Sequence, residues 1–325
     1  MAGWPSVVTL GEVLIDFVAL EAGQPIQLAE TFHRAAGGAP ANVAVALCRL
    51  GVPAAIIGKL GDDPFGRFLR QTLADENVEL RGLINSPGAL TPLAFVGSDG
   101  RAGRSFVFYH NAMADTLLKP QEVDRELISH ASIFHFGSVT LAAEPSRSAT
   151  LAAARWAREQ GLLVSFDPNV RLELWDSPRR ALDSITETLV CADMVKISGD
   201  EVEFLTGSTD PAEGCRRLLR CGPSMAVVTL GREGCYFDNG DFAGKVLAPP
   251  VDVVDTLGAG DAFMAGLLAG IASASDHSIV RDPVALPAAL RFANAVGAIA
   301  TTRHGAIPAL PDRGQVDALL RTMPT

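Results

Sequence analysis

A glycine turn beside a carboxylate is the part of this sequence best suited to chemistry. Residues 255–261 read DTLGAGD, so Gly258 and Gly260 come just before Asp261, and an alanine-rich helical pattern follows. Glycines let a backbone approach a ligand closely. The free N–H groups at a helix start form an anion site together with the helix dipole. An anion site beside a carboxylate suits phosphoryl transfer to an alcohol, in which Asp261 would orient the attacking hydroxyl and then accept its proton.

Other interpretations of this turn compete with phosphoryl transfer. An aspartate that only caps a helix after a tight turn would look the same. A nicotinamide dehydrogenase would carry a G-x-G-x-x-G turn after its first strand, whereas this turn lacks the third glycine and lies late in the chain. The G-x-x-x-x-G-K-S/T pattern of P-loop kinases does not occur in the sequence. We expect Asp261 to be ionised, because a helix N-terminus favours negative charge.

The composition is that of a soluble globular protein. The chain has 325 residues, 48% of them hydrophobic and 20% charged. A net charge of -10 argues against a nucleic-acid or anionic-membrane binder. The five cysteines have no metal-site or redox spacing, so we expect buried, reduced thiols. Glu12 and Asp16 interrupt the first apolar stretch, and the apolar run 262–274 is shorter than the roughly 20 residues a membrane span needs. These features predict a cytoplasmic protein.

The predicted elements alternate between strands and helices. Strands are expected at residues 7–10, 13–18, 54–57, 133–136, 163–166, 194–197 and 225–229, and an apolar strand is expected to end at Asp255. Helices are expected at residues 41–50, 65–76, 145–160, 178–190, 201–205, 262–274 and 285–302. A loop is expected at 58–66, and hairpins around turns at 98–101 and 238–240. This order predicts an α/β protein with a doubly wound, mostly parallel sheet and a small β lid.

Several long motifs resemble the ribokinase-like (PfkB) family of carbohydrate kinases. Residues 255–261 look like its C-terminal signature, residues 37–44 (GGAPANVA) like the start of its N-terminal signature, and residues 58–66 like the end of that signature. Sequence motifs that resemble those of fructokinases are found at residues 11–17 (GEVLIDF), 134–138 (FHFGS), 166–171 (FDPNVR), 172–177 and 201–207. The resemblance covers essentially the whole chain.

The resemblance implies one ribokinase-like domain over residues 1–325, with a lid formed by segments 13–33 and 91–111. It implies ATP-dependent phosphorylation of a sugar hydroxyl, with D-fructose to fructose 6-phosphate as the leading reaction. Two alternatives stay open. One is the same chemistry on another acceptor, such as 2-keto-3-deoxygluconate, ribose, tagatose phosphate or a nucleoside. The other is a non-catalytic sugar-binding regulator on the same fold, which would have no need to keep a base such as Asp261.

The resemblance also implies roles for individual residues. The catalytic residues would be Asp261 as base, the anion hole of Gly258, Ala259 and Gly260, and Arg171 near the phosphates or the sugar. The sugar would be bound by Asp16, Gly37, Gly38, Asn42, Phe106 and Asn169. The nucleotide would be bound by Lys196, Thr229, Gly231, Gly234 and Asn294. Glu201 would organise Mg²⁺ through water, and K⁺ would be bound by backbone carbonyls at Asp255, Leu257, Ala300, Arg303 and Gly305. Asp16 also stands out without the resemblance, because an aspartate in an apolar stretch is costly to bury unless it is hydrogen-bonded.

Three positions depart from the family pattern. Ser198 replaces the asparagine of the N-x-x-E motif, which bears on the Mg²⁺ water network. His110 replaces a lid arginine, so a sugar or interface contact is expected to differ there. Leu257 replaces a common threonine, a change that leaves a backbone role intact. Exposed lid strands are natural pairing edges, so a homodimer is expected.

Overall fold

The computed structural model describes residues 3–21, 24–98, 104–274 and 277–323. The main sheet has nine strands in the order β13-β12-β11-β10-β9-β8-β1-β4-β5. All neighbours from β5 to β11 pair in parallel, and the hairpin β12–β13 adds an antiparallel edge. The strands are β1 (Val7–Leu10), β4 (Ala54–Gly61), β5 (Leu83–Ser86), β8 (Ile133–Gly137), β9 (Leu163–Asp167), β10 (Met194–Ser198), β11 (Met225–Thr229), β12 (Cys235–Asp238) and β13 (Ala243–Val246).

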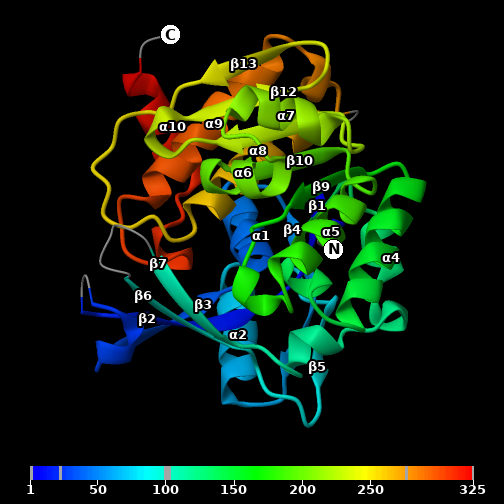
Figure 1. Cartoon of the computed structure of the whole chain (residues 1–325), viewed down its shortest axis with the longest axis vertical. Helices are drawn as coiled ribbons and strands as arrows, with labels where there is room; N and C mark the ends of the chain where they lie inside the picture. The colour runs from blue at the N-terminus through cyan, green and yellow to red at the C-terminus, as the bar shows by residue number, and fades with distance from the viewer. Residues whose placement is uncertain (1–2, 22–23, 99–103, 275–276, 324–325) are drawn as a thin grey trace.

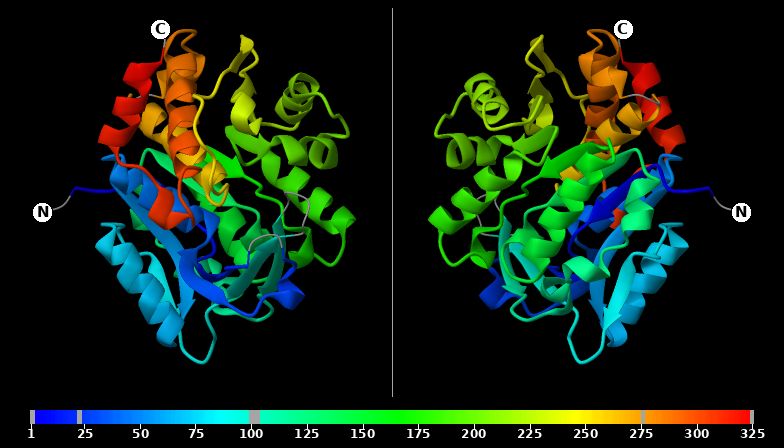
Figure 2. Two further views of the ribbon diagram at one scale, coloured as in Figure 1. Left: turned by 90° about the vertical axis from the view of Figure 1, so that its left-hand side faces the viewer. Right: turned by 90° about the vertical axis from the view of Figure 1, so that its right-hand side faces the viewer.

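Helices cover both faces of this sheet, as Figure 2 shows. One face carries α1 (Ala39–Arg49), α2 (Pro64–Asp75), α8 (Ala259–Ala272), α9 (Ala285–Ala300) and α10 (Arg313–Thr322). The other carries α3 (Arg125–Ser129), α4 (Ser146–Glu159), α5 (Pro178–Leu189), α6 (Gly199–Thr206) and α7 (Pro211–Leu219). Neighbouring strand residues belong to opposite cores, Val7 to the first and Val8 to the second. This two-residue period is what a sheet buried on both faces requires. The predicted α/β, doubly wound fold is confirmed.

A second sheet of four strands lies beside the main one (Figure 1). Its order is β3-β2-β6-β7, with β2 (Leu14–Ala19), β3 (Phe32–Gly37), β6 (Leu93–Ser98) and β7 (Arg104–Tyr109). Phe17 of β2 packs edge-on against Phe65 of α2 and stacks on Phe95 of β6. The Phe17–Phe65 contact anchors the small sheet to the main body. Among the described residues, none of the helices combines the length and apolar character needed to cross a membrane.

The predicted strand ending at Asp255 is wrong. Residues 251–255 form no strand, and Val253 and Val254 are 58% and 50% exposed. The N–H groups of Val254 and Asp255 both donate to the Thr301 carbonyl, at 2.8 and 3.0 Å. An apolar run becomes a strand only where a neighbouring strand pairs with it, and here the end of α9 takes those donors.

Other boundaries also shifted from their predicted places. The predicted loop at 58–66 is mostly regular structure, because β4 continues to Gly61 by pairing with β5, and α2 begins at Pro64. Helix α8 begins at Ala259, two residues before Asp261. Hairpin β12–β13 is confirmed. Strands β6 and β7 do pair antiparallel, but most of the predicted turn at 98–101 lies outside the described residues. Of the five cysteines, Cys48 and Cys221 are only half-buried, while the other three are buried as expected.

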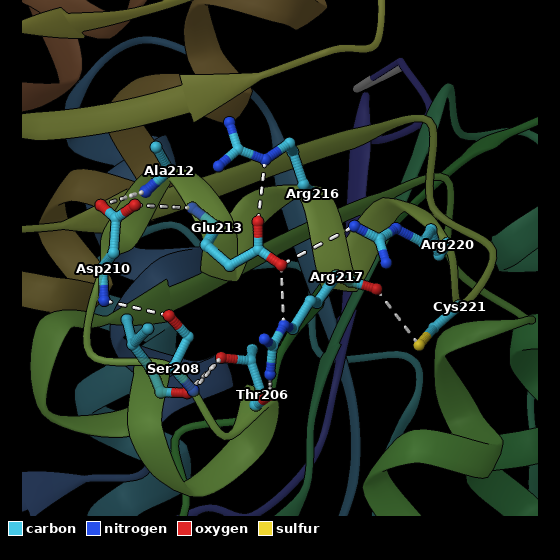
Figure 3. A network of polar contacts seen from close by, with 10 residues as sticks. Thr206, Ser208, Asp210, Ala212, Glu213, Arg216, Arg217, Arg220 and Cys221 are labelled. Carbon is cyan, nitrogen blue, oxygen red and sulfur yellow. Dashed lines mark hydrogen bonds and ion pairs between the residues drawn. The ribbon is translucent and has the colours of Figure 1, made fainter.

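Helix α7 was not predicted, although its start carries clear signals. Asp210 caps the helix by accepting from the N–H groups of Ala212 and Glu213, and Pro211 occupies the first helical position. Along the helix, the Glu213 carboxylate contacts arginines 3.0, 2.9 and 3.7 Å away. Figure 3 shows this network, whose arginines are Arg216, Arg217 and Arg220.

This network allows a prediction about stability. Glu213→Gln is expected to move the urea midpoint only slightly, because exposed ion pairs contribute little and are screened by salt. Asp210→Ala is expected to lower the free energy of unfolding more, by about 1 kcal/mol, because it removes the helix cap. Urea titrations at low and high salt check this order. A larger loss for Glu213→Gln would show that the surface network, not the cap, stabilises α7.

Candidate active site

The glycine turn before α8 is built by two tight contacts. Gly258 has φ of 75°, a left-handed conformation that suits glycine, and a Cβ there would lie 2.9 Å from the Ala306 Cβ. Asp255 Oδ1 accepts from the Leu257 N–H and Oδ2 from the Gly305 N–H, each at 2.9 Å. Helix α8 therefore starts without a side-chain cap. In the described part of the chain, the N–H groups of residues 260–261 meet no backbone acceptor. The arrangement is that of an anion site.

Asp261 follows this turn and is 8% exposed. Its Oδ2 accepts a 2.8 Å hydrogen bond from Asn42 Nδ2, contributed by α1. Burial raises the pKa of Asp261 to about 6, while the Asn42 hydrogen bond opposes the increase and the charge of Asp167 adds to it. Burial, rather than the helix N-terminus, sets the direction of this shift. Most molecules still carry an ionised Asp261 at neutral pH, and the raised pKa makes this carboxylate a better base.

A cavity of about 340 Å³ opens beside Asp261. Six predicted residues from distant segments share its lining: Asp16, Gly38, Asn42, Phe106, Asn169 and Arg171. Asn42 Oδ1 is buried and has no hydrogen-bond partner among the described residues. A buried acceptor without a partner is costly, so the cavity calls for a ligand with a donor such as a hydroxyl.

Two glycines shape the wall of this cavity, which we call the Asp261 cavity. Gly38 has φ of 105°, and a Cβ there would lie 2.3 Å from the Glu12 carbonyl oxygen. Gly37 lies just outside the lining, where a Cβ would meet Asp16 Oδ2 at 2.1 Å. Only glycine fits at position 38, where the first turn of α1 lies directly against the turn that follows β1, and a side chain at position 37 would displace the Asp16 carboxylate.

A second cavity of about 460 Å³ lies on the other side of the turn. Its lining includes the predicted residues Thr229, Gly231, Gly234 and Asn294. Apolar side chains, among them Pro249, Val251 and Phe263, complete much of the wall. Asn294 Nδ2 donates to the Val246 and Leu247 carbonyls at 3.0 and 3.4 Å. This amide therefore fixes the end of β13 against α9 and leaves an apolar slot suited to a flat ring.

A polar junction connects the two cavities. Lys196, Arg171 and Ser198 line both the Asp261 cavity and a further hollow that also includes Glu201 and Thr229. Gly260 and Thr256 line all three. A ligand in the apolar slot can thus extend past the α8 N-terminus toward Asp261.

The junction contains a buried ion pair. Lys196 is 4% exposed, and its Nζ lies 2.7 Å from Asp167 Oδ2. Burial lowers the pKa of Lys196, but the charges of Asp167 and the neighbouring carboxylates outweigh burial and raise it above its ordinary value. A Cβ at Gly260 would lie 3.1 Å from the Lys196 Nζ. A permanent positive charge therefore faces the anion site.

The sequence matches the pfkB family carbohydrate kinase over residues 5–313. The chain belongs to this family of carbohydrate kinases. It is 47% identical to a probable chloroplastic fructokinase-6 of Arabidopsis thaliana, over 98% of this chain and 83% of that protein. A fructokinase from Xylella fastidiosa with bound ATP superposes with a TM-score of 0.89 at 35% identity, covering 98% and 99% of the two chains. A fructokinase double mutant from Vibrio cholerae O395, bound to fructose, ADP and potassium ion, gives 0.87 at 36% identity, covering 98% and 100%.

In this kinase, Ser198 and Glu201 form a capping box at the start of α6. Glu201 Oε2 accepts from the Ser198 N–H at 2.7 Å and from its hydroxyl at 2.9 Å, and Oε1 accepts from the Val170 N–H at 2.6 Å. The serine that replaces asparagine therefore still orients the acidic residue. Glu201 keeps its place in the junction lining.

The positions predicted for K⁺ lie on two segments that Asp255 joins. Its carboxylate binds the N–H groups of Leu257 and Gly305, and its own N–H donates to the Thr301 carbonyl. Ala300 ends α9, and Arg303 is exposed between it and Gly305. The five residues are therefore brought to one region of the kinase, while cation binding there stays a prediction.

His110 does not line either cavity. It is 7% exposed, and its Nε2 lies 2.6 Å from Asp115 Oδ2. The side chain turns inward to this carboxylate, and the expected difference in a sugar or interface contact stays a prediction.

Sequence reasoning missed several residues of the site. Asp167 ends a buried strand within the motif at residues 166–171, and this position was the only sequence signal of its role in the site. Phe263 looked like any apolar residue of a buried helix. Glu12, which lines the Asp261 cavity, looked like an interruption of an apolar run.

Proposed function

We propose that this kinase transfers the γ-phosphoryl group of ATP to the 6-hydroxyl of D-fructose, giving fructose 6-phosphate and ADP. One observation carries the proposal: a cavity with an unpartnered acceptor and a base, Asn42 and Asp261, opens at Gly260 into a slot suited to a nucleotide. The relatives named fructokinase, including one bound to fructose and ADP, support fructose as the acceptor.

In the proposed reaction, Asp16, Gly38 and Asn42 hold sugar hydroxyls, with Phe106 and Asn169 completing the wall. Asp261 orients the attacking hydroxyl and takes its proton as the new O–P bond forms and the bond to ADP breaks. The N–H groups of the turn at residues 258–261 stabilise charge on the transferred group. Lys196 and Arg171 add positive charge at the junction. Arg171 is positioned by Phe106, whose ring centroid lies 5.1 Å from the guanidinium carbon.

The donor and cations are part of the same proposal. Adenine would occupy the slot lined by Asn294, and the phosphates would pass Thr229, Gly231 and Gly234. Mg²⁺ binds ATP phosphates with few protein ligands and several waters, which fits a single oriented carboxylate, Glu201. K⁺ would be bound by the carbonyls of Asp255, Leu257, Ala300, Arg303 and Gly305, and would add positive charge beside the anion site. Carbonyl oxygens are ligands suited to this cation.

We also propose a single domain over residues 1–325 whose small sheet acts as a lid over the sugar. Lid closure would exclude water and so limit ATP hydrolysis. Val107 and Tyr109 of β7, the edge strand, are 44% and 55% exposed. Such an edge suits pairing with a second copy, and a homodimer is proposed on that basis. A cytoplasmic location stays a prediction.

The pKa of Asp261 predicts the acid side of the pH profile. Below pH about 6 the carboxylate is protonated and cannot accept the hydroxyl proton. We therefore expect kcat/KM for the sugar to fall about tenfold for each pH unit well below that value. Initial rates measured at saturating ATP between about pH 5 and pH 9 check this. A profile that stays flat down to pH about 4 would contradict a titrating base at this position.

A sugar panel with detection of ADP release, with and without K⁺, tests the proposed function. D-Fructose is expected to give the highest kcat/KM, and K⁺ is expected to increase it. Faster turnover of 2-keto-3-deoxygluconate, ribose, tagatose phosphate or a nucleoside would show that this compound, and not fructose, is the preferred phosphoryl acceptor. If no compound in the panel causes ADP release, a non-catalytic sugar-binding protein would be favoured.

A further inference from the structure

Three buried ionisable side chains interact electrostatically at the edge of the Asp261 cavity, and one of them, Glu12, is part of its lining. Glu12 follows β1, His110 follows the lid strand β7, and Asp115 lies five residues further on. They are 3%, 7% and 2% exposed. We call Glu12, His110 and Asp115 the acid–histidine cluster. None of the three takes part in the proposed chemistry, yet burying such groups is costly, so their burial here needs a physical explanation.

Glu12 connects the cluster to the cavity. Its Oε1 accepts a 2.8 Å hydrogen bond from the Ala39 N–H, the first residue of α1. The N-cap residue, Gly38, has no side chain to perform this task. The carboxylate of Glu12 therefore acts as the cap of α1 from a distant segment, where the helix dipole favours a negative charge.

The first turn of α1 connects Glu12 to the catalytic base Asp261. Asn42 lies in the first turn, its N–H donates to the Gly38 carbonyl at 2.9 Å, and its side chain donates to Asp261. Any shift of the α1 N-terminus moves Asn42 relative to Asp261. Such a shift would disturb the sugar-binding acceptor and the base together.

The cluster has unused hydrogen-bonding capacity. Glu12 Oε2 and Asp115 Oδ1 are both buried, and neither has a partner in the described ranges of the chain. Burial raises the pKa of Glu12 to about 7, the Ala39 N–H opposes the increase, and the charges of Asp115 and Asp261 add to it. Burial lowers the pKa of His110, but the contact with Asp115 and the charge of Glu12 raise it above its ordinary value. The cluster can thus change its charge near neutral pH.

We propose that Glu12 is a positioning residue for the phosphoryl-acceptor site: its ionised carboxylate, with a positively charged His110 offsetting the buried charges of Glu12 and Asp115, fixes the first turn of α1 and so sets where Asn42 meets Asp261. The inference rests on the proposed function. A neutral Glu12 binds the Ala39 N–H more weakly, because hydrogen bonds to an ionised group are roughly twice as strong as neutral ones.

Glu12→Gln tests this role, since glutamine keeps the size and one acceptor oxygen but cannot ionise. For the wild type we expect kcat/KM for the sugar to fall in two steps as pH decreases, near pH 7 for Glu12 and near pH 6 for Asp261. Glu12→Gln should lose the upper step. At pH about 8 it should have about tenfold lower kcat/KM, mainly through a higher KM for the sugar. KM for ATP should stay within about twofold of the wild-type value.

His110→Gln provides the opposite change. It keeps a hydrogen-bonding side chain beside Asp115 but removes the positive charge that favours an ionised Glu12. The upper step should therefore move to higher pH rather than disappear. Asp312→Asn is the matched control: Asp312 caps α10 by accepting from the Gln315 N–H at 2.9 Å and lines neither cavity, so its pH profile should equal that of the wild type.

A second measurement does not depend on turnover. After correction for intrinsic exchange rates, hydrogen exchange at the Ala39 N–H should slow as pH rises through about 7 in the wild type but not in Glu12→Gln. Equal sugar KM, equal pH profile and equal Ala39 exchange in Glu12→Gln and wild type would overturn the proposal. If fructose is not phosphorylated, the profiles are measured with the acceptor that is. If no acceptor is found, the exchange result decides alone, so failure of the proposed function and failure of this inference are separate results.

Discussion

Replacing Asp261 with asparagine is expected to lower kcat about 10³-fold while ATP affinity stays within about twofold. Asparagine keeps an oxygen that can accept from Asn42 Nδ2, so the 2.8 Å contact and the fold should survive. It cannot take a proton, so the orienting base is lost. Because the loss arises only in the transition state, it should reduce kcat and kcat/KM equally.

Rates of ADP release and calorimetric titration with a non-hydrolysable ATP analogue check this expectation. Asp183→Asn is a suitable control, because Asp183 is an aspartate on the surface of α5, paired with Arg179 at 2.9 Å. Turnover near the wild-type rate in Asp261→Asn would contradict the proposed mechanism. A parallel loss of ATP binding would instead mean that the carboxylate holds the anion site together.

Lys196→Met is expected to have the second largest effect, on stability and turnover together. It leaves the Asp167 carboxylate buried without its 2.7 Å partner, which should lower the free energy of unfolding by about 3–5 kcal/mol. It also removes the positive charge that faces the anion site near Gly260. Urea unfolding and ADP release measure the two losses separately.

A double variant separates stability from function. Lys196→Met with Asp167→Leu replaces the buried pair by apolar side chains, which is often neutral for stability. We expect most of the lost stability to return while kcat stays at least about 10²-fold reduced. Recovery of turnover together with stability would show that Lys196 is only structural.

The parts of the site that the sequence predicted well are local ones. The glycine turn before α8 and the paired glycines before α1 depend on backbone conformations that only glycine and a following helix provide. Such patterns can be recognised from a few consecutive residues. The alternation of apolar strands and helices predicted the doubly wound sheet, because each element is also recognisable from its own residues.

The parts that were missed or wrong depend on distant segments. Residues 251–255 have the composition of a strand, but no strand lies beside them to pair with. The helix N-terminus suggested an ionised Asp261, but only the fold shows that burial raises the pKa of this carboxylate to about 6. His110 and Asp115 are close in sequence, but only the fold shows that their charges interact with that of Glu12. Such roles are fixed by tertiary contacts, which a single sequence does not display.

The position of the phosphate in the product shows whether this kinase phosphorylates fructose at its 6-hydroxyl. Carbon-13-labelled fructose, ATP, Mg²⁺ and K⁺ would be incubated with the protein, and carbon–phosphorus couplings would be read by NMR while ADP is counted. We expect phosphorus to couple to carbon 6, with one ADP released for each phosphorylated sugar. Phosphate on carbon 1, or ADP released with inorganic phosphate and no sugar ester, would contradict it.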